Sequence, residues 1–123
     1  MIRISEAESV VMCVLWESAP RTAEDVIACL AGTGWAEATI KTLLNRLLNK
    51  GAISAVKDGR RFLYRPAMER DAWVLEESTS LLDRLFDGRI APLVAHFSQH
   101  RKLDPTDLAQ LRQLLEELDD GQC

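Results

Sequence analysis

The polar side chains with the clearest chemical use lie within residues 39–50, TIKTLLNRLLNK. At about 100° per residue, Thr42, Asn45 and Arg46 fall on one side of a helix. An arginine can donate two parallel hydrogen bonds to guanine, an asparagine suits the edge of adenine, and a threonine can touch the methyl group of thymine. Residues 39–50 contain no carboxylate. The pattern therefore predicts a helix whose outer face enters the major groove of double-stranded DNA.

The distribution of charge also favours a polyanionic partner. The 123-residue chain has a net charge of −4, yet residues 39–65 alone carry +6, with −4 before them and −6 after them. One basic segment in an acidic chain is typical of a nucleic-acid contact, although a basic face that only meets water has the same composition. The residues expected to contact DNA are Thr39, Lys41, Thr42, Asn45, Arg46, Lys50, Lys57, Arg60 and Arg61.

Two histidines offer a different chemistry. His96 and His100 are four residues apart, the spacing at which two imidazoles on a helix can share a metal ion. No third ligand can be placed from the sequence, so we assign no metal site. A metal-responsive regulator that uses this pair remains an alternative. The sequence contains no CxxC pair, phosphate-binding glycine loop or nucleophile–base set, so we expect neither an enzyme nor a cofactor.

The cysteines indicate a reducing compartment. Cys13, Cys29 and Cys123 are odd in number and far apart, unlike a disulfide framework. Cys13 and Cys29 fall among apolar residues, and we expect them to be small core residues. No apolar run reaches the roughly 20 residues that span a bilayer. The N-terminus has no signal-peptide pattern, so we expect a cytoplasmic protein without a membrane partner.

Three helices must position these polar residues. Ser5 with Glu8, and Thr22 with Asp25, have the capping-box spacing of a helix start. Gly32 is expected to be the left-handed residue that ends the second helix. The third helix has the clearest periodicity, with apolar residues at i, i+3, i+4, i+7 and i+8 before Gly51. Its predicted inner stripe is Ile40, Leu43, Leu44, Leu47 and Leu48.

After the third helix the pattern becomes strand-like. Residues 53–56 and 62–65 flank an Asp58-Gly59 turn signal, and Pro66 ends the second strand. Three short helices followed by a basic two-stranded ribbon predict a winged helix-turn-helix domain over residues 1–67. Winged-helix domains also bind proteins, so a protein-interaction module is the second alternative.

Residues 68–123 are acidic and helical. Asp104-Pro105 marks the start of a leucine-rich last helix. About 55 residues of short amphipathic helices bury too little surface alone, so we expect a helical dimerisation domain and a homodimer. The chain is thus expected to be mainly α-helical with a small β-hairpin. The residues expected at the dimer contact are Trp73, Leu81, Leu82, Leu85, Phe86, Val94, Phe97, Leu111, Leu115 and Leu118.

Several stretches together resemble the penicillinase-repressor family, the BlaI/MecI/CopY group. They are ESVVMCVLW, TAEDVIACL, WAEATIKTLLNRLLNKGAI, the YRP after the hairpin, and LFDGRIAPLVAHF. The resemblance implies a homodimer that binds palindromic operator DNA and represses transcription, with the helix at residues 39–50 in the major groove. In the antibiotic-resistance members, it implies a sensor-activated protease that cuts the C-terminal lobe and ends repression.

The sequence departs from the family pattern at three places. The family's scissile bond is typically Asn-Phe, and the aligned pair here is His96-Phe97, the candidate cleavage site. The copper-responsive branch ends in a CxC motif, whereas this chain has only Cys123 near its end. Ala36 stands where the family often has a serine N-cap before the DNA-reading helix, and the missing cap costs about 1 kcal/mol.

Overall fold

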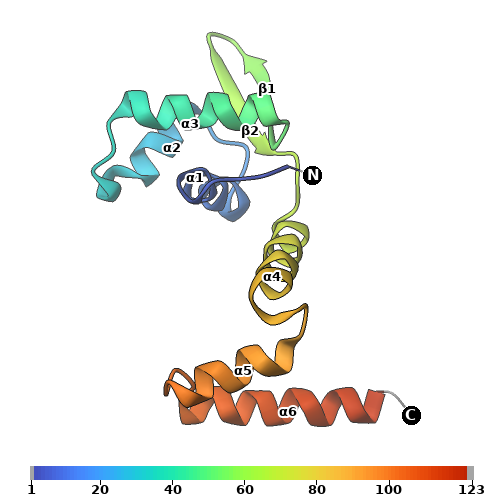
Figure 1. Ribbon diagram of the computed structural model, residues 1–123. Coiled ribbons are helices and arrows are strands. Elements are labelled where there is room, and N and C mark those ends of the chain that lie inside the picture. The colour runs from blue at the N-terminus through green and yellow to red at the C-terminus, as the bar shows by residue number, and fades with distance from the viewer. Residues whose placement is uncertain (1, 122–123) are drawn as a thin grey trace. The chain divides into compact units, whose positions relative to one another are not determined.

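The computed structural model describes residues 2–121 and divides into two compact units, Met1–Val74 (unit 1) and Leu75–Cys123 (unit 2). Cys123 lies outside the described residues. Unit 1 holds α1 (Glu6–Glu17), α2 (Ala23–Cys29), the 3-10 helix η1 (Ala31–Thr33), α3 (Glu37–Lys50), β1 (Ile53–Asp58) and β2 (Arg61–Pro66). Helix α4 (Arg70–Phe86) begins in unit 1, and unit 2 continues with α5 (Ile90–Gln99) and α6 (Pro105–Gly121) (Figure 1).

The first two helices begin at the predicted capping boxes. The Glu8 amide donates to the Ser5 hydroxyl (3.1 Å), and the Ser5 amide donates to the Glu8 carboxylate (2.8 Å). Thr22 and Asp25 make the same reciprocal pair at 3.0 and 3.1 Å. The expectation for Gly32 is wrong. The chain continues from α2 into η1, and Gly34 takes the left-handed conformation (φ 78°).

The core of unit 1 lies between α1, α2, α3 and the start of β1. The predicted inner stripe of α3 is confirmed, because Ile40, Leu43, Leu44 and Leu47 are at most 4% exposed and Leu48 is half-buried. They pack against residues such as Met12 of α1. This burial holds α3 by one face and leaves the other face in solvent.

The hairpin is antiparallel, with a register that runs from Ile53↔Pro66 to Asp58↔Arg61. Gly59 has φ 65°, the turn conformation that the Asp-Gly signal predicts. Arg21, two residues before α2, holds β2 against the helices through two backbone hydrogen bonds. The Tyr64 amide donates to the Arg21 carbonyl (2.7 Å), and the Arg21 amide donates back to the Tyr64 carbonyl (3.1 Å). Three helices with this anchored hairpin form the predicted winged helix-turn-helix.

Two tryptophans attach the first turn of α4 to unit 1. The Trp16 indole nitrogen donates to the Met68 carbonyl (2.9 Å), and the rings of Trp16 and Trp73 lie 5.4 Å apart. Trp73, predicted at the dimer contact, therefore packs within unit 1. Because this contact lies beyond residue 67, unit 1 extends past the domain boundary that the sequence suggested and ends at Val74.

Unit 2 is built differently. Helices α5 and α6 contain no buried residue, and neither does α4. The predicted start of α6 is confirmed, because the Asp107 amide donates to the Asp104 carboxylate at 2.8 Å. None of the described helices is long and apolar enough to cross a membrane.

Cys13 and Cys29 are not core residues, which corrects the sequence-based expectation. Both are exposed. The sulfur of Cys29 accepts a hydrogen bond from the Arg21 guanidinium at 3.1 Å. The two cysteines lie on the solvent side of α1 and α2, because the core-facing positions belong to residues such as Met12 and Val26.

Candidate nucleic-acid interface

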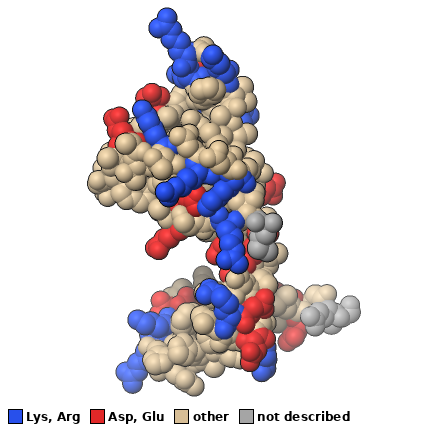
Figure 2. Space-filling view, turned by 45° about the horizontal axis from the view of Figure 1, so that its top comes forward, with Lys and Arg blue, Asp and Glu red and all other residues tan. Residues whose placement is uncertain are grey.

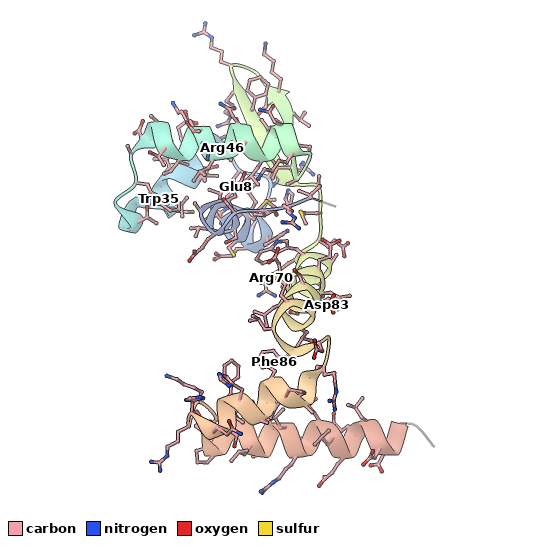
Figure 3. All side chains as sticks on the ribbon, in the orientation of Figure 1. Glu8, Trp35, Arg46, Arg70, Asp83 and Phe86 are labelled. Carbon is pink, nitrogen blue, oxygen red and sulfur yellow. The ribbon has the colours of Figure 1, made fainter. Side chains whose placement is uncertain are left out.

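The outer face of α3 presents four polar side chains to solvent. Lys41, Thr42, Asn45 and Arg46 are all exposed (Figure 3 labels Arg46). The Thr42 hydroxyl donates to the Ala38 carbonyl one turn earlier (2.9 Å), so its methyl group and oxygen lone pairs remain available. This face offers the arginine fork and the asparagine amide that base edges in a major groove require.

A surface hollow of about 260 Å³ lies next to this face. Helices α2 and α3 and strand β2, with the turn before it, enclose it. Its lining residues are Ala23, Glu24, Lys41, Leu44, Asn45, Arg60, Arg61, Phe62 and Tyr64. The hollow therefore brings together Lys41 and Asn45 of the predicted set with Arg60 and Arg61, which lie far from them in the sequence. Three cations facing one space give it a positive potential that suits a phosphate.

The tip of the hairpin carries further positive charge. Lys57, Arg60 and Arg61 are exposed, and Lys and Arg gather at this end of unit 1 in Figure 2. Arg61 lies 3.5 Å from the Asp58 carboxylate, but both side chains are more than half exposed. Such a surface ion pair contributes little, so Arg61 can exchange it for a phosphate.

Lys50 stands apart from the other predicted DNA contacts. Its ammonium binds the carboxylate of the buried Glu8 (2.5 Å) and the Arg3 carbonyl (2.9 Å). Figure 3 shows Glu8 in the space between α1 and α3. Burial alone would raise the pKa of Glu8, but the hydrogen bonds from Lys50 and Ser5 outweigh it and hold the pKa below its usual value. Lys50 thus ties the end of α3 to α1, and its predicted contact with DNA stays a prediction.

Helix α3 begins directly after Ala36, the N-cap position that the family resemblance implies. The helix begins at Glu37, and Ala36 occupies the N-cap without a side-chain hydrogen bond, as its side chain requires. Thr39 is exposed in the first turn, where its amide donates to the Ala36 carbonyl (3.0 Å). The missing cap leaves backbone amides of the first turn without a side-chain acceptor.

The histidine pair gains no further ligand. The rings of His96 and His100 lie 4.6 Å apart, and both residues are exposed on and just after α5. Within residues 2–121 there is no group of three or more His, Cys, Asp or Glu side chains that could hold a metal ion. The histidine spacing alone does not favour the metal-responsive alternative.

The remaining residues predicted at the dimer contact all lie in unit 2. Those more than a third exposed are Leu81, Leu85, Phe97, Leu115 and Leu118, and those half-buried are Leu82, Phe86, Val94 and Leu111. Four other apolar residues of this unit are exposed but are not among those predicted at the dimer contact, namely Leu75, Ile90, Leu108 and Leu114. Leu108 and Leu114 share the helical spacing of the leucine-rich last helix.

The predicted DNA contacts do not include five residues that line the hollow, which are Ala23, Glu24, Leu44, Phe62 and Tyr64. Phe62 and Tyr64 were assigned only to a strand, and Glu24 only to the start of a helix. The strand register could have paired Lys57 with Phe62. Nothing in the sequence could bring Glu24 next to the hairpin, because that proximity depends on how α2 packs.

Comparison with known proteins matches nearly the whole chain, across both units. The family model described as "Penicillinase repressor" matches residues 4–117. The penicillinase repressor of Bacillus licheniformis is 35% identical over 116 residues, which cover 94% of this chain and 91% of that protein. The methicillin resistance regulatory protein MecI of Staphylococcus aureus (strain N315) is 29% identical over 113 residues, 91% of this chain and 92% of that protein.

Solved structures match the winged-helix part. The solution structure of the DNA-binding domain of the repressor BlaI has a TM-score of 0.52 and 40% identity, and the match covers 56% of this chain and 85% of that one. Monomeric Bacillus licheniformis BlaI in complex with the blaP half-operator gives a TM-score of 0.51 and 40% identity over 58% of this chain and 89% of that one.

Proposed function

This chain belongs to the penicillinase repressor family, and on that premise we propose that it represses transcription as a homodimer bound to a palindromic operator. It is a transcriptional repressor with a DNA-binding winged-helix domain, and not an enzyme. The proposal also states which residues contact DNA, which part of the chain forms the dimer and how the repressor leaves its operator.

One observation supports the DNA contact most strongly. Lys41, Asn45 and Arg46 are exposed on α3 beside the hollow that Arg60 and Arg61 also line. In this proposal Asn45 and Arg46 read base edges, and the hairpin arginines bind phosphates or the minor groove. The 40% identical BlaI, whose structure was solved with a half-operator, supports the same use of the domain here.

A salt titration of Arg46→Ala tests the contact. The probe is a fluorescent duplex from the DNA directly upstream of the chain's own coding sequence. We expect log K to fall linearly with log salt, and Arg46→Ala to weaken binding by about 1–3 kcal/mol. Arg70→Ala is the matched control, because Arg70 is an exposed arginine of unit 1 that belongs to α4 and not to α3 or the hairpin. A flat salt dependence would instead favour the protein-interaction module.

The dimer is proposed from unit 2. Its exposed leucines, such as Leu85, Leu115 and Leu118, lie between 59% and 63% exposed in the single chain. A second copy that covers them would remove this apolar surface from water. Two α3 helices held in this way would reach half-sites separated by a whole number of DNA turns.

We propose that the repressor leaves DNA after the peptide bond between His96 and Phe97 is cut, or after an effector binds and changes the geometry of the dimer. Phe97 is 43% exposed on α5, so the bond is accessible once the helix opens locally. The cut would separate α6 and its leucines from the DNA-binding unit. Mass spectrometry after incubation with a sensor-activated protease should give a fragment that ends at His96. If the chain stays uncut and nevertheless dissociates from DNA, release by an effector would be favoured.

A further inference from the structure

We propose that Glu24 limits the affinity of this protein for DNA, because this acidic residue lines the same hollow as the cations that attract phosphate. The inference rests on the proposed function, since it concerns the same surface. It adds a residue whose charge opposes binding, and so makes Glu24 a determinant of how tightly the repressor holds any DNA.

The position of Glu24 carries the argument. It comes from α2, whereas Lys41 comes from α3 and Arg60 and Arg61 come from the hairpin, and all four line one hollow of about 260 Å³. A phosphate drawn in by the three cations would share this hollow with the acidic side chain of Glu24. Two negative charges in one hollow repel each other, and salt weakens the repulsion only in part.

The side chain of Glu24 has no other polar partner within the described part of the chain. Its neighbour Asp25 accepts the Thr22 amide (3.0 Å) in the capping box. The pKa of Asp25 is held below its usual value first by the Thr22 backbone and then by its hydroxyl, and also by the charges of Arg21 and Arg61. Among residues 2–121, the side chain of Glu24 makes no hydrogen bond and no salt bridge, and Glu24 is exposed.

A phosphate carries no sequence information, so the repulsion should act on every duplex. It lowers the affinity for unrelated DNA as well as for the operator. A repressor with a lower nonspecific affinity for DNA spends less time on competing sites. It also dissociates from DNA more readily when its dimer is disrupted.

The test compares three substitutions in the full chain. Glu24→Gln removes the charge and keeps the shape, Glu24→Lys reverses the charge, and Glu6→Gln is the matched control. Glu6 is also exposed in the first turn of its helix, α1, but it does not line the hollow. Binding is measured by fluorescence anisotropy on the upstream duplex and on an unrelated duplex, at about 50 and 200 mM salt.

We expect Glu24→Gln to tighten binding to both duplexes by about 3- to 10-fold at low salt, with a smaller gain at high salt. Glu24→Lys should tighten it further, and Glu6→Gln should leave it near wild type. Equal affinities for Glu24→Gln and Glu6→Gln would overturn the inference. Weaker binding by Glu24→Gln would also overturn it, since the carboxylate would then hold the cations in place. Wild-type protein that binds neither duplex with a salt slope would overturn the proposed function itself.

Discussion

The two units of this chain carry apolar residues at similar helical spacing, but only unit 1 buries them. The buried hydrophobic residues of the described chain all lie between Val11 and Ile53, whereas nine of the eleven large hydrophobic residues that are exposed lie in unit 2. Unit 1 thus completes its own core and offers a polar surface. Unit 2 leaves its apolar residues exposed. This contrast supports the proposal that DNA contact and self-association belong to different parts of one short chain.

The comparison is tested most strongly in the core of unit 1. Leu47 of α3 is fully buried, so Leu47→Ala should lower the free energy of unfolding by about 2–5 kcal/mol, because it removes packing and leaves a cavity. Urea denaturation at several protein concentrations would measure it. Because the cavity is within one unit, the loss should not depend on protein concentration. A loss below about 1 kcal/mol would mean that unit 1 is not the self-sufficient core described here.

A charge on α6 tests the other half of the comparison. Leu115 is 62% exposed in the single chain, so Leu115→Asp should leave unit 1 folded but weaken the dimer by about 1.5–3 kcal/mol, the value of burying a leucine. Sedimentation velocity over a dilution series would show the shift to monomer. Gln110→Asp adds the same charge at an exposed polar position of α6 and serves as the control. A monomeric wild type would contradict the proposed dimer.

The smallest expected effect concerns the link between α1 and the DNA-reading helix. Glu8→Gln should cost about 1–3 kcal/mol at neutral pH, because the buried partner of Lys50 loses its negative charge and the hydrogen bond is no longer between two charged groups. The folded pKa of Glu8 lies below its ordinary value of 4.5. Its contribution is therefore complete above about pH 4.5 and disappears as the pH falls through the folded pKa. Urea denaturation between pH 7 and pH 3 should show wild type and Glu8→Gln converging. A constant difference over that range would argue against the pair.

Local signals in the sequence predicted much of unit 1. The capping boxes at Ser5 and Thr22, the stripe of α3 and the turn at Gly59 each depend on residues a few positions apart, and all four are confirmed. Contacts between distant elements could not be predicted in this way. Lys50 lies 42 residues from Glu8, and only the packing of α1 against α3 shows that it is engaged there.

The same limit explains where the structure differs from the expectations for single residues. Apolar neighbours in the sequence suggested a buried Cys13 and Cys29, although neighbours on a helix point in different directions. The periodicity of Trp73 indicated an apolar face but not which unit it would join. The hollow itself depends on three elements, α2, α3 and the hairpin, and so Glu24 and Phe62 could be found only in the fold.

The composition of the protein–DNA complex tests the central claim most directly. Native mass spectrometry of the full chain on its upstream duplex, at low salt, counts the chains bound. The account predicts two chains per duplex for the wild type, and predominantly one for Leu115→Asp, with weaker binding, because unit 1 would still contact a half-site. A wild-type complex with a single chain, or no complex on any duplex at low salt, would contradict it.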